Sequence, residues 1–134
     1  MKKVVAIIIF MLLSITLVVF ASNDPSIKGE QRQGILKAMQ MHVNDNTVNG
    51  NYYIYDAVTN DVKSLKYNKL QSGIVKKEKF YVSCADFTDD TGKLYDMDFL
   101  VAENDGSYKV VDSILHKVDG EERKYETKIP IVRF

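Results

Sequence analysis

The side chains best suited to chemistry lie between residues 84 and 116 of the 134-residue chain. Asp86, Asp112 and His116 are candidates for an internal site, because a buried carboxylate has a raised pKa and can act as a base. Asp96 and Asp98 alternate along one run of residues, which is typical of the solvated face of a strand. The two groups therefore predict different sites, one internal and one on a surface.

Other kinds of chemistry lack the necessary residues. No twelve-residue calcium-loop pattern occurs, and His42 and His116 are too few for a zinc site without carboxylate ligands. No serine or cysteine sits in a recognisable nucleophile setting, and glycine-rich phosphate loops are absent. We therefore expect no metal, no cofactor and no catalytic residue.

Cys84 is the single cysteine, so an intramolecular disulfide is impossible. It could pair between molecules or react as a free thiol. Because Cys84 alternates with Phe80 and Val82, we expect all three to share the face that packs against a helix. On that interpretation Cys84 behaves as a small buried apolar group.

The elements that position these residues centre on a predicted hairpin, residues 79–101. Two runs rich in β-forming residues flank the turn at 89–92, where Gly92 takes the positive-φ position. In the second run the apolar residues fall on one face, opposite Asp96 and Asp98: Tyr95, Met97, Phe99 and Val101. The outer face of the hairpin is then expected to carry Asp96, Asp98, Tyr81 and Ser83 as a binding surface.

A helix is predicted over residues 25–42, because Asp24-Pro25 is a typical helix start and an apolar stripe follows at spacings of three and four. Gly34 marks a close approach to the sheet. The rest of the domain reads as strands at 52–57, 62–70, 108–118 and a short segment at 123–127, with Ser72-Gly73 breaking the second of these. One helix packed on a curved antiparallel sheet of about five strands is an α+β fold.

Residues 1–21 read as an export signal, with a basic start, an apolar run over 4–20 and a cleavage site after Ala21. The alternative is an uncleaved membrane anchor. Residues 22–134 then form one domain, in the periplasm, secreted, or anchored facing outside the cytoplasm. Without Lys2 and Lys3 the chain keeps 16 basic and 18 acidic residues, which argues against binding nucleic acid.

The helix followed by a strand meander resembles the cystatin-like and NTF2-like folds. Residues 81–87, 95–99 and 114–120 also look like segments of small exported bacterial proteins of unassigned function, and this resemblance spans about residues 34–127. Protease inhibition of the cystatin type is not expected, because Gln71-Ser72-Gly73-Ile74-Val75 has the wrong order for the inhibitory loop and tryptophan is absent.

We therefore expect an exported, non-catalytic binding or accessory domain that acts through its sheet surface on another exported or envelope protein. The alternative is an NTF2-like small-ligand binder or enzyme, with Asp86, Asp112 and His116 in a pocket between helix and sheet. A third interpretation is a membrane-tethered domain that assists a larger complex.

Overall fold

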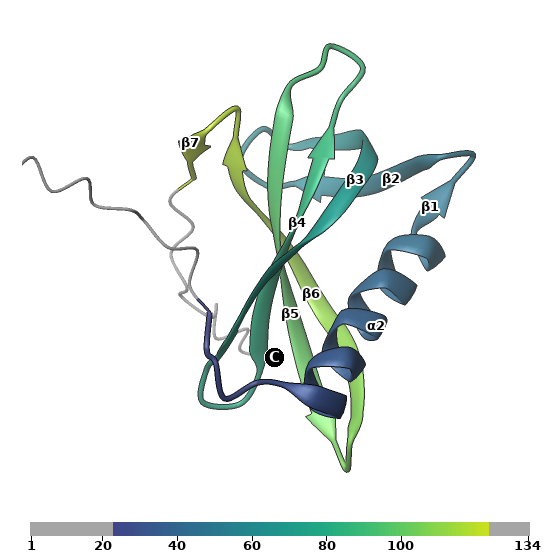
Figure 1. Ribbon diagram of the computed structural model, residues 1–134. Helices are drawn as coiled ribbons and strands as arrows, with labels where there is room; N and C mark the ends of the chain where they lie inside the picture. Colours follow the sequence, from purple (N-terminus) through teal and green to yellow (C-terminus); the bar gives the residue numbers. More distant parts are fainter. Residues whose placement is uncertain (1–22, 124–134) are drawn as a thin grey trace, which may run out of the picture.

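The computed structural model describes residues 23–123, which form one helix lying across one face of an antiparallel sheet (Figure 1). The seven strands follow one another in sequence order, each antiparallel to the next. The elements are α2 (Gly29–Asp45), β1 (Thr47–Val48), β2 (Asn51–Asp56), β3 (Asp61–Lys76), β4 (Tyr81–Thr88), β5 (Leu94–Asn104), β6 (Ser107–Val118) and β7 (Glu121–Glu122).

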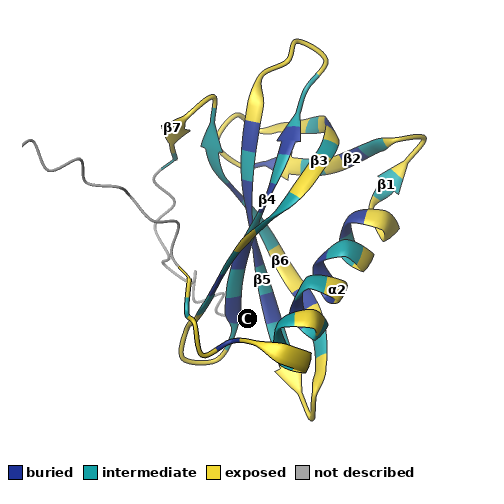
Figure 2. Ribbon diagram, viewed as in Figure 1, coloured by how far each residue is buried: buried dark blue, intermediate teal, exposed yellow. Residues whose placement is uncertain are grey.

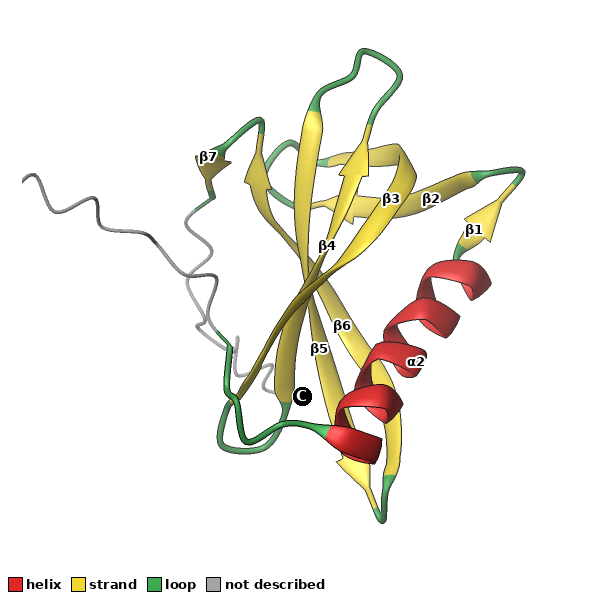
Figure 3. Cartoon of the chain, viewed as in Figure 1, coloured by secondary structure: helices red, strands yellow, loops and turns green. Residues whose placement is uncertain are grey.

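The predicted α+β arrangement of helix on antiparallel sheet is thus confirmed, with seven strands rather than about five. The additional strands, β1 and β7, have two residues each. The predicted export signal at 1–21 and residues 124–127 of the predicted last segment lie outside the described residues. Figure 3 shows the loops that join the strands and the segment that leads into α2.

The turn chemistry of the sequence is found in the hairpins. Asp105-Gly106 has φ of 49° and 77°, and Asp119-Gly120 has 56° and 82°. Positive φ at both central residues gives a type I′ turn, whose twist matches that of the flanking strands. Gly92 has φ of 82°, as predicted for the central hairpin.

The helix begins at Gly29, four residues later than predicted, and ends at Asp45. The Asp24 carboxylate accepts hydrogen bonds from the backbone N–H and the hydroxyl of Ser26, at 2.9 and 2.7 Å. Such a local turn satisfies the aspartate without starting a helix. The sequence signal at Asp24 was therefore a turn signal.

The helix buries one stripe against the sheet, and it packs chiefly on β6 (Figure 2). The buried residues recur at spacings of three and four, the period of an amphipathic helix: Ile35, Ala38, Met39 and Val43. The opposing core is formed by side chains of β2 to β6, including Phe87, Met97 and Phe99, each with 0% of its surface exposed.

Gly34 of α2 lies close to Tyr108 of β6, which is the close approach to the sheet that was predicted. A Cβ atom built on Gly34 would lie 2.5 Å from Cε2 of Tyr108, well inside van der Waals contact. The absence of a side chain at position 34 therefore leaves room for the Tyr108 ring beside the helix.

Replacing Gly34 with alanine should lower the free energy of unfolding by about 1–3 kcal/mol in urea denaturation, because the new methyl group overpacks against Tyr108. In a Tyr108→Ala background the same replacement should raise it by up to about 1 kcal/mol, since alanine is the better helix former. Equal effects in the two backgrounds would show that the Tyr108 ring does not set the helix–sheet distance.

Strand β3 continues through Ser72-Gly73, which was predicted to break it. Its pairing with β4 shifts register between Tyr67 and Lys69 and again between Leu70 and Ile74. A β-bulge bends a strand and increases its twist without ending it, and glycine is common at such positions. The glycine therefore bends one long strand.

The face prediction for β4 is wrong. Tyr81 and Ser83 are buried, at 3% and 1% exposure, whereas Val82 and Cys84 are half-buried on the opposite face. The polar groups in the core have partners: the Ser83 hydroxyl donates to the Gly73 carbonyl at 2.7 Å, and the Tyr81 hydroxyl donates to Glu103 at 2.8 Å. Because these hydrogen bonds satisfy them, Tyr81 and Ser83 can replace apolar residues inside.

The coiling of the sheet brings its two ends together. Asp56, at the end of β2, accepts a hydrogen bond from the guanidinium of Arg123, just after β7. Their side chains are 2% and 17% exposed. A buried ion pair therefore joins strands that are far apart in the order of the sheet.

Candidate functional site

Five side chains with reactive or ionisable groups gather on the face of the sheet opposite α2. We call them the outer-face cluster: Cys84 and Asp86 on β4, Asp96 and Asp98 on β5, and His116 on β6. Asp86 pairs with Asp96, and Cys84 pairs with Asp98, in the register of the central hairpin. His116 falls in the register shift between the partners of Asp96 and Met97.

Asp98 is the centre of the outer-face cluster. The Cys84 thiol donates to Asp98 Oδ1 at 2.8 Å, and His116 Nδ1 lies 3.4 Å from the same oxygen. Only 5% of Asp98 is exposed, so these contacts replace water around its carboxylate. Asp98 is therefore a buried residue that holds Cys84 and His116 together, rather than the solvated residue that was predicted.

Asp86 and Asp96 form the more open side of the cluster. Gln71 Nε2 donates to Asp86 Oδ1 at 2.7 Å and to Asp96 Oδ1 at 3.2 Å. Lys69 Nζ lies 3.9 Å from Asp86 Oδ2, on a side chain that is 72% exposed. The amide of Gln71 thus bridges two carboxylates that face each other across the strands.

The electrostatics of the cluster keep the thiol protonated. Burial raises the pKa of the Cys84 thiol, and its hydrogen bond to Asp98 and the charges of Asp98, Asp96 and Asp86 raise it further. Burial also raises the pKa of Asp96, with the Asp98 charge as the next cause. Cys84 is therefore a hydrogen-bond donor in this site and a poor nucleophile.

Native Cys84 should react with iodoacetamide at least about tenfold more slowly than the urea-unfolded chain, since only the thiolate attacks. Replacing Asp98 with asparagine should speed the reaction of the folded protein, because it removes a negative charge beside the sulfur. Mass spectrometry of the alkylated protein measures both rates. Equal rates for the native and unfolded chains would contradict this account of the thiol.

The cluster also contains potential metal ligands. The sulfur of Cys84 and carboxylate oxygens of Asp96 and Asp98 lie within 4.8 Å of one another. A thiol among the donors would suit zinc better than calcium or magnesium, which prefer oxygen ligands alone. In chemical terms the outer-face cluster can donate and accept hydrogen bonds, and its donor atoms have the spacing to approach a cation.

The structure brings residues of both predicted sites together in one cluster. Asp96 and Asp98 from the predicted surface join Asp86 and His116 from the predicted pocket, together with Cys84. Tyr81 and Ser83 lie in the core. Neither predicted group is assembled as a unit.

Asp112 is exposed, and its carboxylate accepts a hydrogen bond from the Ser113 N–H at 2.8 Å. It was predicted to share an inner face with His116. The buried positions of β6 are Val110 and Leu115, an odd number of residues apart, so the alternation changes phase along the strand. The register shift between Leu100 and Val101 of β5 accounts for that change.

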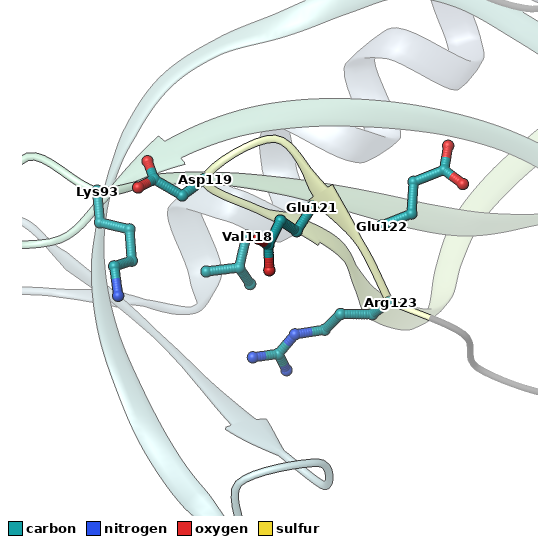
Figure 4. Close-up of a pocket in the computed structure, with 6 residues that line it drawn as sticks. All are labelled: Lys93, Val118, Asp119, Glu121, Glu122 and Arg123. Carbon is teal, nitrogen blue, oxygen red and sulfur yellow. The ribbon is translucent and has the colours of Figure 1, made fainter.

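A groove of about 420 Å³ lies beside the cluster, with both charge signs on its walls. Lys69, Asp86, Asp96 and Lys117 line it, together with Leu94 and Tyr95. A second cavity, of about 360 Å³, lies where β6 turns into β7, and Figure 4 shows the residues that line it, Lys93 and Arg123 among them. A third, of about 230 Å³, lies between β3 and the turn at 89–92.

The lining residues of these three cavities come from the sheet and its loops, not from α2. Between helix and sheet, Ile35, Met39 and Phe99 have 0% of their surface exposed. The described part of the chain thus has apolar side chains where the NTF2-like alternative placed its polar pocket.

Sequence reasoning missed Gln71, Lys69 and Lys117 as parts of the site and gave Cys84 the wrong face. A signal for the cluster was present, because a hairpin closed at 89–92 pairs residue 86 with 96 and residue 84 with 98. Nothing in the sequence pointed to Gln71, which reaches the site because the shifted register of β3 places it beside β4.

No family model matches the chain, and no curated protein or solved structure matches it either. Across residues 23–123 no helix is long and apolar enough to cross a membrane. The function is therefore inferred from the geometry of the site.

Proposed function

We propose that this chain is an exported, non-catalytic binding domain of cystatin-like shape, which contacts another exported or envelope protein through the outer face of β4 to β6. The observation that carries the proposal is the outer-face cluster lying beside a groove of mixed charge, on the face of the sheet opposite α2.

The charges of the groove favour a protein partner. Asp86 and Asp96 line it with Lys69 and Lys117, so a partner surface must match both signs in a fixed arrangement. Such complementarity gives specificity and a defined orientation more than raw affinity. Leu94, which is 57% exposed, adds an apolar contact of the kind found at the centre of transient interfaces.

The interior supports binding over catalysis. The space between helix and sheet contains fully buried apolar side chains, and Asp112 is exposed on β6. Asp98 and His116 contact each other in the cluster instead of facing an internal cavity. Export rests on the pattern of residues 1–21, and the mass of the mature chain tests it together with the experiment below.

A photo-crosslinking residue at position 117, on the rim of the groove, should give a discrete adduct with one envelope or secreted protein in the producing cell. The same residue at the exposed position Lys37 on α2 is the control and should give no such adduct. Asp96→Asn should reduce the adduct at position 117 at least about tenfold if the carboxylate carries the complementarity.

Adducts of equal yield at positions 117 and 37, or none at either, would contradict the proposal. Asp98 is left unchanged in this experiment, because it is buried and its removal would take the acceptor from the Cys84 thiol.

A further inference from the structure

A chain of hydrogen bonds crosses the core from the last turn of α2 to β6. His42 Nε2 lies 3.0 Å from the Tyr52 hydroxyl, and that hydroxyl donates to Ser113 Oγ at 3.3 Å. On the other side of the ring, His42 Nδ1 lies 3.3 Å from Nδ2 of Asn46. Three elements, α2, β2 and β6, are thus connected through the His42 imidazole and the Tyr52 hydroxyl.

The partners fix the direction of each hydrogen bond. Asn46 Nδ2 also donates to the His42 carbonyl at 2.8 Å, which identifies it as the amide nitrogen. Nδ1 of His42 must then accept. With Nδ1 accepting, the proton of the neutral ring is on Nε2, which donates to the Tyr52 oxygen. This arrangement requires a neutral imidazole with its proton on Nε2.

We propose that His42 is a pH-sensitive clamp, which holds the C-terminal end of α2 to β2 and β6 while neutral and releases it when protonated. A proton on Nδ1 would point at the donor group of Asn46, so one hydrogen bond would become a repulsive contact. The ring also packs edge-on against Phe99 at 5.3 Å between centroids, where a charge is poorly solvated.

The charged groups around the ring do not compensate for its burial. Asp45, on the same helix, favours the protonated form, and Tyr52 and Phe99 face the ring from β2 and β5. Asp112 on β6 acts on Tyr52, whose pKa is raised by burial. The net result is that burial lowers the pKa of His42 below its usual 6.5, the Asp45 charge being the smaller effect.

The sign of the pH dependence follows from this lowering. The folded protein binds a proton at His42 less readily than the unfolded chain does. The contribution of neutral His42 to the free energy of unfolding is therefore fully present above about pH 6.5. It is lost as the pH falls from there through the pKa of the folded state. The end of the helix should therefore loosen in mildly acidic surroundings.

The test compares urea midpoints of the purified chain at pH 7.5 and 5.5 for the wild type, His42→Gln and His116→Gln. Glutamine at position 42 is neutral and keeps an N–H near Tyr52. We expect the midpoint to fall with pH in the wild type and in His116→Gln, and the fall to be smaller by at least half in His42→Gln. An equal fall in all three proteins overturns the clamp.

Two further measurements use the folded wild type, so they do not depend on the variant folding. Only two histidines occur, so the His42 ring can be followed by NMR and should titrate below pH 6.5. Amide exchange at residues 39–45, corrected for intrinsic rates, should accelerate several-fold between pH 7.5 and 5.5 relative to β5. Titration at or above pH 6.5, or unchanged protection at the helix end, overturns the proposal.

Discussion

Replacing Asp56 with alanine should lower the free energy of unfolding by about 3–5 kcal/mol, because it leaves the Arg123 guanidinium without its buried partner. Burial by itself would raise the pKa of Asp56, but hydrogen bonds from Arg123, Thr59 and the Val58 N–H lower it. The stabilisation is therefore present above the usual carboxyl pKa and lost as the pH falls below it. Urea unfolding at neutral pH measures the change.

The matched control is Asp61→Ala, which removes another aspartate of an ion pair on the neighbouring strand. Asp61 lies 3.2 Å from Lys63, but its side chain is 61% exposed. An exposed pair contributes at most about 1 kcal/mol. If the two substitutions lower the free energy of unfolding equally, the ion pair between Asp56 and Arg123 contributes no more than a surface contact.

Phe99→Ala should lower the free energy of unfolding by about 3–5 kcal/mol, because it removes a fully buried ring and leaves a cavity. Phe99 contacts the rings of His42 and Phe87, with centroids 5.3 and 6.5 Å away, so the loss falls at the junction of helix and sheet. Thermal and urea unfolding of the purified variant give the change.

Leu94→Ala is the control for Phe99→Ala, since it truncates an apolar residue of the same strand that is 57% exposed. This substitution should change the free energy of unfolding by no more than about 0.5 kcal/mol. A loss at Phe99 no larger than the loss at Leu94 would show that the β5 face is not the centre of the core.

The sequence predicted the local features well. Gly92, Asp105-Gly106 and Asp119-Gly120 have the turn conformations that their residue types favour. The alternation of β5 correctly assigned four side chains to the core: Tyr95, Met97, Phe99 and Val101. These features depend on neighbours within a few residues, so the local chain contains the information. The predicted start of the helix was wrong because the local hydrogen bonds of Asp24 fit a turn as well as a helix start.

The assignment of faces on β4 could not be made from the strand alone. Val82 and Cys84 are as apolar as the residues that alternate with them, and a period of two does not say which set is inside. Register with β5 decided it, because Ala85 pairs with Met97 and Phe87 with Tyr95. The long-range hydrogen bonds of Tyr81 and Ser83 then made a polar inner face possible.

The sequence by itself determined that residues 23–123 contain one helix, a run of antiparallel hairpins and a concentration of aspartates between residues 86 and 98. Only the tertiary structure decided which of these residues share a site. Register shifts in β3 and β6 changed the alternation, moved Asp112 outward and brought Gln71 and His116 to Asp86, Asp96 and Asp98. Such shifts depend on how neighbouring strands pair and bend around the helix, which no single strand specifies.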